Sequence, residues 1–188
     1  MEKSQLLHLI VNEAIELRLP VAKDAVPFFA LIQRNRAYLR KYLSWVDWHK
    51  SIEETYRFFF FVHEGFYDKR RYNPLIFYRG HVAGTVSLFD VDMVNDKAEI
   101  GYWLGEEYTG KGIMTQAARR LLRFGFHNLR LNRVILRAAV GNQPSIAVAK
   151  RLGFTFEGIL RQDKMLHGRY IDMELYSLLA SEFTLAED

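Results

Sequence analysis

A glycine-rich segment in the middle of the chain is the clearest candidate for chemistry. It reads Gly105-Glu106-Glu107-Tyr108-Thr109-Gly110-Lys111-Gly112-Ile113-Met114-Thr115 and lies between a predicted strand and a predicted basic amphipathic helix. Glycines let the backbone turn tightly, so that several amide N–H groups at the start of a helix converge on one anion. The segment therefore predicts a site for a phosphate or pyrophosphate group.

Two other interpretations of this segment stay open. The stretch Gly105-x-x-x-x-Gly110-Lys111 matches a P-loop through its lysine, but Gly112 stands where that motif needs a Ser or Thr hydroxyl for magnesium. The strand before it is also not the first of an alternating β-α series, as a P-loop fold would require. In the remaining interpretation the glycines only form a tight turn.

Charge is distributed unevenly along the chain. The net charge of +4 comes from 26 Lys and Arg against 22 Asp and Glu. Between Tyr108 and Arg169 there are 12 basic and two acidic residues, a local charge of +10, which leaves 14 basic and 20 acidic residues, or −6, for the remainder. The basic region either meets an anionic ligand or forms a solvated helix face balanced by acids elsewhere.

Several classes of chemistry lack the residues that they need. The absence of cysteine excludes a disulfide scaffold, a thiol nucleophile and a thiolate zinc site. The six histidines form no pair at ligand spacing, so we expect no metal site, and no Gly-x-Ser-x-Gly elbow indicates a hydrolase. No apolar run reaches the roughly 20 residues of a membrane span, and the apolar stretch after Ser4 is too short for a secretory signal. We expect a cytoplasmic protein.

Length and periodicity predict one mixed α/β domain over residues 1–188. With 49% hydrophobic residues the chain can bury one core, and 188 residues match the roughly 100 to 200 residues of a single domain. Strand and helix patterns alternate without an internal repeat. Strands are expected at 17–19, 75–78, 82–89, 98–104, 133–140, 154–161 and 170–178, and helices at 25–43, after residue 51, around 118–129 and at 144–152.

The ordered set of motifs carries a family resemblance. A predicted strand leads into the loop Thr109-Gly110-Lys111-Gly112-Ile113-Met114, which is followed by the basic helix and another strand. After that strand come two further motifs, Asn142-x-Pro144-Ser145 and Lys150-Arg151-Leu152-Gly153-Phe154. This order resembles the acetyl-CoA signature of the GNAT superfamily of N-acetyltransferases. The resemblance extends over nearly the whole chain to the RimJ/RimL branch, which acetylates N-termini of ribosomal proteins. The motifs that carry this extension are Leu43-Ser44-Trp45, Ser51-x-Glu53-Glu54-Thr55, the strand at 98–104 and Glu157-Gly158-x-Leu160.

The resemblance implies a fold and a cofactor site. The fold is a single α/β (α+β) GNAT-like domain, with a mixed, mostly antiparallel, twisted sheet of about six to seven strands flanked by about four helices. The co-substrate is acetyl-CoA, whose pyrophosphate would be held by backbone amides of Thr109, Gly110, Lys111, Gly112, Ile113 and Met114, although Thr109 and Met114 depart from the family pattern. A splayed strand would let backbone groups of Tyr102, Trp103 and Leu104 pair with pantetheine.

Two residues are candidates for catalysis by direct transfer. Glu99 lies in the strand that other GNAT enzymes use for a glutamate base, although it would serve equally as the partner of a neighbouring arginine. Some RimL-type enzymes place a glutamate base where this chain has Lys164. The adjacent Asp163 or a water molecule is therefore the alternative base. The usual GNAT tyrosine falls on Ala149, which leaves Ser145 to protonate the departing thiolate. Asn142 matches a cofactor-contacting asparagine, or simply caps a helix.

The acceptor is expected to be an amine. An α-amine has a pKa near 7.7 to 8.0 against about 10.4 for lysine, so an N-terminal acceptor needs less help from a base. We expect the N-terminus of a ribosomal or other protein, with a small amine such as a polyamine, amino sugar or drug as the alternative. A non-catalytic RNA- or ribosome-binding module is the alternative from another class, and nucleic acid would otherwise be only an indirect partner.

The aromatic residues lead to two further expectations. The aromatic content favours a homodimer. Trp45 is expected at the acceptor cleft, and Trp48 is expected in the core.

Overall fold

Eight strands form one mixed sheet within residues 6–184, the part of the chain that this computed structural model describes. In spatial order the sheet is β1-β2-β3-β4-β5-β6-β8-β7, and β5–β6 is the parallel pair among otherwise antiparallel neighbours. The strands are β1 (His8–Ile10), β2 (Ile15–Arg18), β3 (Leu75–Tyr78), β4 (His81–Asp92), β5 (Lys97–Leu104), β6 (Arg133–Ala139), β7 (Thr155–Leu166) and β8 (Arg169–Leu179). The predicted α/β class and mixed sheet are confirmed, with more strands than expected.

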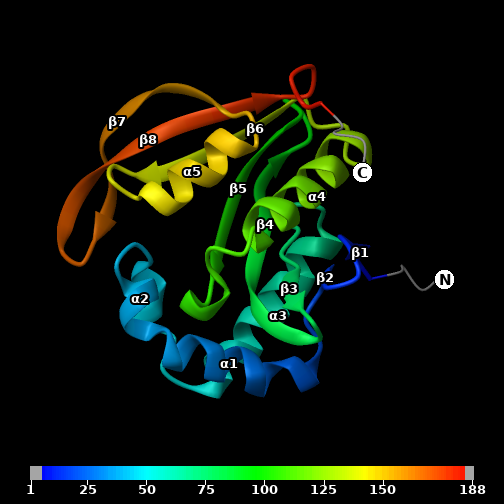
Figure 1. Cartoon of the computed structure of the whole chain (residues 1–188), viewed down its shortest axis with the longest axis vertical. Helices are drawn as coiled ribbons and strands as arrows, with labels where there is room; N and C mark the ends of the chain where they lie inside the picture. The colour runs from blue at the N-terminus through cyan, green and yellow to red at the C-terminus, as the bar shows by residue number, and fades with distance from the viewer. Residues whose placement is uncertain (1–5, 185–188) are drawn as a thin grey trace.

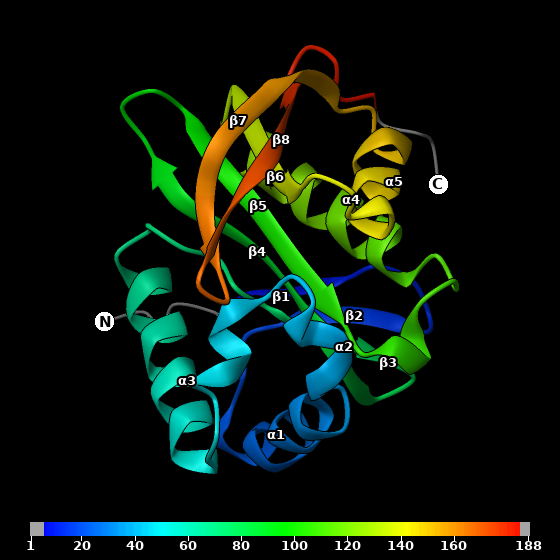
Figure 2. The same cartoon turned by 90° about the vertical axis from the view of Figure 1, so that its left-hand side faces the viewer.

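Helices lie on both faces of the sheet (Figures 1 and 2). The α-helices are α1 (Ala25–Arg34), α2 (Arg36–Arg40), α3 (Ile52–Tyr67), α4 (Ile113–His127) and α5 (Gln143–Arg151), and the 3-10 turns are η1 (Ala22–Asp24), η2 (Ser44–Asp47) and η3 (Glu106–Tyr108). Helix α4 packs on one face, where Ala117, Ala118, Leu121 and Leu122 are fully buried. Helices α1 and α3 pack on the other face, around Phe28, Phe59 and Leu75.

The helix expected over residues 25–43 is divided in two at Asn35. Its side chain is buried and donates from Nδ2 to the Leu31 carbonyl at 3.0 Å, while Oδ1 accepts the backbone N–H of Glu106 at 2.8 Å. Asn35 therefore binds the start of η3 instead of continuing the helix, because its amide satisfies a distant backbone group. This interruption accounts for the difference between about four predicted helices and the five observed.

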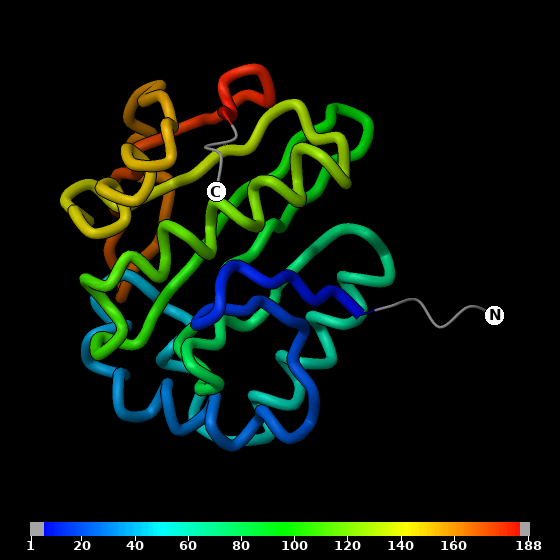
Figure 3. Tube along the Cα trace, turned by 45° about the vertical axis from the view of Figure 1, so that its right-hand side comes forward, coloured from blue at the N-terminus to red at the C-terminus, as the bar shows by residue number. Residues whose placement is uncertain are grey.

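Strand β1 was missed by the sequence patterns. It has three residues, and its Leu9 alone is buried, so it offers no alternation that a periodicity test can detect. It pairs antiparallel with β2, His8 opposite Arg18, at the end of the sheet far from the β7–β8 hairpin (Figure 3). The strands expected at 75–78 and 82–89 pair as an antiparallel hairpin, and so do those expected at 154–161 and 170–178, around a turn at His167-Gly168.

Candidate active site

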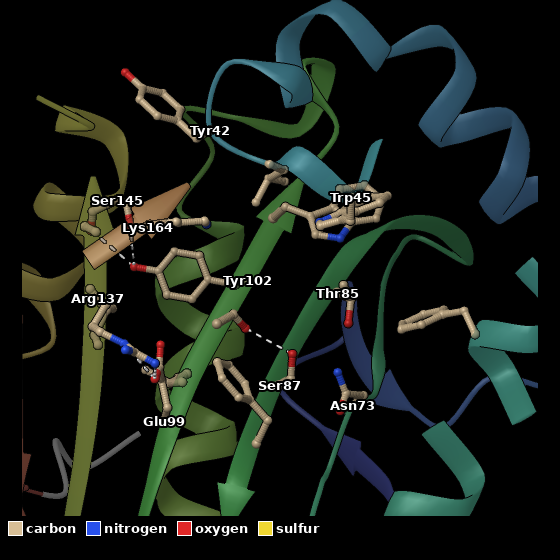
Figure 4. A pocket seen from close by; sticks show the side chains of 18 of the residues that line it. Tyr42, Trp45, Asn73, Thr85, Ser87, Glu99, Tyr102, Arg137, Ser145 and Lys164 are labelled. Carbon is tan, nitrogen blue, oxygen red and sulfur yellow. Dashed lines mark hydrogen bonds and ion pairs between the residues drawn. The ribbon is translucent and has the colours of Figure 1, made fainter. Parts of the chain in front are cut away.

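A cavity of about 680 Å³ lies where β5 and β6 part from each other. The two strands pair only from Lys97 to Glu99 on β5 and from Arg133 to Ile135 on β6. Beyond these three pairs the strands diverge, and Ile100–Trp103 and Leu136–Ala139 both line the cavity (Figures 1 and 4). The splay expected from the sequence is therefore present, and it leaves one backbone edge of each strand without a sheet partner.

The glycine-rich loop ends at the N-terminus of α4. Gly110 and Gly112 both have φ +73°, a conformation that favours glycine, and Gly112 is the N-cap residue of the helix. The side chains of Ile113 and Met114 are buried in the core, so only their backbone amides face a ligand. The first N–H groups of a helix lack intrahelical partners and attract anions. Lys111 is exposed, with Nζ 2.8 Å from the Glu107 carbonyl.

Glu99 is buried on the floor of the cavity and is bound by Arg137. Arg137 donates from Nε at 3.0 Å and from Nη2 at 2.6 Å, both to the same oxygen, Oε2. No described residue donates to Oε1, and Glu99 lines the cavity. Burial raises the pKa of the Glu99 carboxyl, against the opposing effect of Arg137. Glu99 therefore has both an arginine partner and an oxygen available to a ligand.

Two further charged groups lie beside this pair. Asp163 Oδ2 is 3.4 Å from Arg137 Nη1. Lys164 lines the cavity, and burial lowers the pKa of its ammonium group. The position that holds a glutamate in some RimL-type enzymes therefore carries a cavity-facing lysine here, and Asp163 reaches the site through Arg137.

Ser145 lies in the first turn of α5, next to the hydroxyl of Tyr102. Ser145 Oγ donates to Tyr102 Oη at 3.3 Å, and Tyr102 Oη donates to the Ser145 carbonyl at 3.2 Å (Figure 4). Burial raises the pKa of Tyr102 to about 12, so the phenol stays protonated. Asn142 Oδ1 accepts the backbone N–H of Ser145 at 3.5 Å, as the N-cap of α5. The helix-cap interpretation of Asn142 is thus present, and Asn142 also lines the cavity.

Aromatic side chains close the other end of the cavity. Trp45 lies 5.8 Å from Trp103 and 5.8 Å from His49, measured between ring centroids, and lines the cavity as expected. Trp48 was expected in the core, which is wrong: it is 79% exposed and also lines the cavity. Trp48 comes directly after η2, in which Val46 is the residue that is buried.

Sequence reasoning missed several lining residues. Arg137 was counted only as a basic residue, Lys164 was named only as the position where some RimL-type enzymes have a glutamate, and Tyr102 was assigned through its backbone rather than its hydroxyl. Asn73 and Arg71 were not considered, although both line the cavity. A signal existed for Arg137, because it alternates with the buried Leu136 and Ala138 and so lies on the opposite face of β6. The Tyr102–Ser145 contact joins residues 43 positions apart and has no local signal.

Comparison with known proteins defines the class of enzyme. Residues 14–155 match the acetyltransferase (GNAT) domain family. The chain belongs to this family and is an N-acetyltransferase. None of the helices within residues 6–184 is long and apolar enough to span a bilayer, and no three His, Asp or Glu side chains in that range are grouped to hold a metal ion.

Its relatives include ribosomal-protein acetyltransferases. YdaF of Bacillus subtilis (strain 168) is 41% identical over 179 residues, covering 92% of this chain and 95% of YdaF. The ribosomal-protein-serine acetyltransferase of Escherichia coli (strain K12) is 32% identical over 170 residues, covering 89% of this chain and 93% of that protein. A solved structure of RimL, the ribosomal L7/L12 α-N-protein acetyltransferase, in complex with coenzyme A has a TM-score of 0.89 at 31% identity, covering 92% and 98% of the two chains. The RimJ/RimL branch is the group of proteins that the chain resembles.

Proposed function

We propose that this single-domain enzyme transfers the acetyl group of acetyl-CoA directly to the N-terminal α-amine of a ribosomal or other protein. The observation that carries the proposal is the cavity between the unpaired edges of β5 and β6, with Glu99 and Ser145 on its walls. The E. coli relative is a ribosomal-protein-serine acetyltransferase, and the RimL structure holds coenzyme A, which supports both the acceptor and the donor.

The residues at the N-terminus of α4 fit a pyrophosphate. The amides from Thr109 to Met114 would bind its oxygens, because Gly110 and Gly112 allow the backbone to turn without side chains in the way. The exposed Lys111 adds a positive charge to the loop before α4. The free edge of Tyr102, Trp103 and Leu104 on β5 would donate and accept hydrogen bonds along pantetheine, with Asn142 opposite. Acetyl-CoA, when bound, supplies an acetyl thioester.

Glu99 is proposed as the base that takes a proton from the acceptor ammonium. Arg137 fixes the orientation of the carboxylate through Oε2, and no described residue donates to Oε1 of this cavity-lining side chain. Burial raises the carboxyl pKa, which brings it closer to that of an α-amine and makes proton transfer less unfavourable. A water molecule can carry the proton over a longer distance.

Ser145 is proposed to protonate the departing sulfur, with Tyr102 as its partner. The two hydroxyls are 3.3 Å apart, so a proton given up by Ser145 can be replaced from Tyr102. The high pKa of Tyr102 keeps this proton in place until the transfer. A backbone amide on the free edge of β5 would stabilise the developing oxyanion, since a fixed donor needs no reorganisation.

We also propose that the enzyme acts in the cytoplasm as a homodimer. The support for the dimer is a group of exposed apolar side chains on the β7–β8 hairpin that a second copy of the chain could cover. These side chains are between 46% and 65% exposed: Phe156, Ile159, Met165 and Tyr170. Sedimentation equilibrium of the purified protein tests the dimer, which predicts twice the mass of 22.1 kDa.

One set of incubations tests the acceptor. The protein is mixed with acetyl-CoA and, separately, with peptides that have free N-termini, N-blocked lysine peptides, polyamines or aminoglycosides, and acetylated products are measured by mass. N-terminal peptides should be acetylated fastest. Faster acetylation of polyamines or aminoglycosides would replace the proposed acceptor with a small amine.

A thermal-shift experiment tests the cofactor site. Acetyl-CoA at a hundred times its dissociation constant should add about 2.7 kcal/mol of stability. Gly112→Asp should abolish this shift, because it places a negative charge against the pyrophosphate. Gly112→Asn is the control: it matches Asp in size and in tolerance of the positive φ but carries no charge, so it should keep most of the shift. A shift as large as the wild-type one in both variants would locate the cofactor elsewhere.

A further inference from the structure

Two cavity residues that the proposed chemistry does not use lie together beside β4. Tyr72 forms an antiparallel bridge to Leu88. The Tyr72 N–H donates to the Leu88 carbonyl at 2.7 Å, and the Leu88 N–H donates to the Tyr72 carbonyl at 2.9 Å. Tyr72 is buried on the α4 side, against Phe124. Because side chains alternate along an extended chain, Arg71 and Asn73 lie on the opposite face, where both line the cavity.

Asn73 has a buried carbonyl oxygen without a partner. Its side chain is 6% exposed, and Oδ1 accepts no hydrogen bond from any residue in the described range. The nearby hydroxyls are directed elsewhere, since Thr85 donates to the Pro74 carbonyl at 2.9 Å and Ser87 donates to the Gly101 carbonyl at 3.3 Å (Figure 4). Buried polar groups are nearly always hydrogen-bonded, so the Asn73 side-chain oxygen lacks the donor that such a group normally has.

Arg71 is a half-buried cation held by aromatic rings instead of a carboxylate. Its guanidinium carbon lies 4.6 Å from the ring centroid of Phe61 and 5.5 Å from that of Phe89. No described carboxylate is within ion-pair distance of the Arg71 guanidinium. At longer range the charge of Asp90 raises the Arg71 pKa and that of Arg70 lowers it. Gly65 makes this position possible, because a Cβ there would lie 2.7 Å from Arg71 Cβ. The guanidinium is therefore fixed and available to an anion.

The register of the sheet gives the spacing between this cation and the proposed base. Arg71 lies opposite Phe89, and Phe89 is paired with Glu99. Two steps between neighbouring strands separate Arg71 from Glu99 by about 10 Å. An extended peptide advances about 3.3–3.6 Å per residue, so an acceptor amine at Glu99 places the side chain of its second or third residue near Arg71.

We propose that Arg71 and Asn73 form a subsite for acceptor peptides that carry an acidic side chain at the second or third residue. Arg71 binds the carboxylate, and the Asn73 side-chain amide, turned so that Oδ1 enters the cavity, accepts a backbone N–H of the same peptide. This inference rests on the proposed N-terminal acetyltransferase function and narrows its substrate class. The same cation repels polyamines, so the subsite also acts against the small-amine alternative.

The test compares two pairs of peptides that differ in one charge. Peptides with Asp or Asn at the second residue, and with Asp or Asn at the third, are acetylated under identical conditions, and the Asp/Asn ratio of kcat/KM is measured. The wild-type ratio should be roughly tenfold or more at one of these positions, as expected for a charge-assisted hydrogen bond. In Arg71→Met the ratio should fall to about one. Arg70→Met is the matched control, because Arg70 is exposed, carries the same charge and does not line the cavity.

The ratio is independent of how much of a variant is folded, because both peptides meet the same enzyme. A wild-type ratio near one at both positions, or a ratio unchanged in Arg71→Met, overturns the subsite and leaves the proposed function intact. Failure to acetylate any of the peptides, while acetyl-CoA still raises the melting temperature, overturns the proposed acceptor and the subsite together.

A second variant tests Asn73 by separating stability from binding. Asn73→Leu keeps a similar volume and removes the unpartnered oxygen, so the melting temperature should stay the same or rise. KM for the preferred peptide should increase several-fold while KM for acetyl-CoA stays unchanged. A lower melting temperature with unchanged peptide KM would assign Asn73 a structural role and remove it from the subsite.

Discussion

Strand β6 carries two arginines that each bind a glutamate, and the two glutamates differ in chemistry. Arg133 binds Glu157 with both carboxylate oxygens, at 2.8 Å and 2.5 Å, and Ser177 Oγ donates to Glu157 Oε1 at 2.7 Å. These bonds lower the pKa of the Glu157 carboxyl to about 2. Arg137, four residues further along the same face, binds one oxygen of Glu99, whose pKa is raised by burial.

The difference shows that the arginine partner does not by itself decide what a carboxylate can do. The Glu157 side chain is 32% exposed and its charge is satisfied at both oxygens, so it stays ionised and structural. The Glu99 side chain is 11% exposed and lines the cavity, and Arg137 bonds only to its Oε2. Desolvation outweighs the single-oxygen ion pair there, so the pKa of the Glu99 carboxyl is raised where that of Glu157 is lowered.

The largest expected effect separates the two glutamates by activity. Glu99→Gln should lower kcat about a hundredfold, because it removes the proposed base and keeps a hydrogen bond to Arg137. Acetyl-CoA affinity should change little. Glu157→Gln, the matched variant, should leave kcat within about threefold of the wild type. Steady-state kinetics with saturating acetyl-CoA measure both, and equal kcat values would mean that water or another group is the base.

The next prediction concerns pH. Arg137 lowers the pKa of Glu99 against the effect of burial, so Arg137→Met should raise that pKa further. The acidic limb of the kcat/KM profile should then move to higher pH, because Glu99 acts as a base only when ionised. Asp163, Asp90 and Lys164 also act on Glu99 and remain in the variant. Arg133→Met should leave the limb where it is in the wild type, and a shift of the same size in both variants would contradict the assignment.

The smallest expected effect is on stability. Since the folded-state pKa of Glu157 lies below its ordinary value of 4.5, its contribution is present above pH 4.5 and is lost as pH falls toward about 2. Glu157→Gln should therefore cost about 1 kcal/mol at neutral pH, a modest value for a partly exposed pair, and nothing near pH 2. Thermal unfolding across this range measures the loss.

Glu99 should show the opposite sign in the same unfolding experiment. Its raised folded-state pKa means that its favourable contribution is present below the unfolded pKa and is lost as pH rises through the folded one. The stability of Glu99→Gln relative to the wild type should therefore improve with rising pH. Parallel curves for the two Gln variants would remove the distinction between the pairs.

Most elements of the fold could be predicted, and the exceptions have physical causes. Helix α4 has apolar side chains at spacings of three and four, and β5 and β6 have apolar residues in strand patterns, so local periodicity was sufficient. The division of a helix at Asn35 depends on Glu106, 71 residues away, which no local pattern contains. Strand β1 depends on its pairing with β2.

The candidate site could be predicted only to the level of its loops and strands. Motif order indicated the glycine loop, Glu99 and Ser145, because each lies in a segment with its own pattern. The choice between a base and an ion-pair partner for Glu99 was left open. The ion pair with Arg137 is present and uses one carboxylate oxygen, and the role of Glu99 as a base stays a proposal. The Tyr102 hydroxyl and the pair Arg71–Asn73 depend on which face of a strand meets the cavity, which requires the assembled sheet.

The three-pair contact between β5 and β6 also determines how the molecule exchanges amide hydrogens with water. Strands β6, β8 and β7 are joined to one another along most of their length, whereas only three residue pairs join them to β5. Segments with few connecting hydrogen bonds open as cooperative units below the free energy of global unfolding. We therefore expect strands β6 to β8 with α5 to open as such a unit, and a molecule bound across the gap to β5 to slow its deuterium uptake without altering that of β2 to β4.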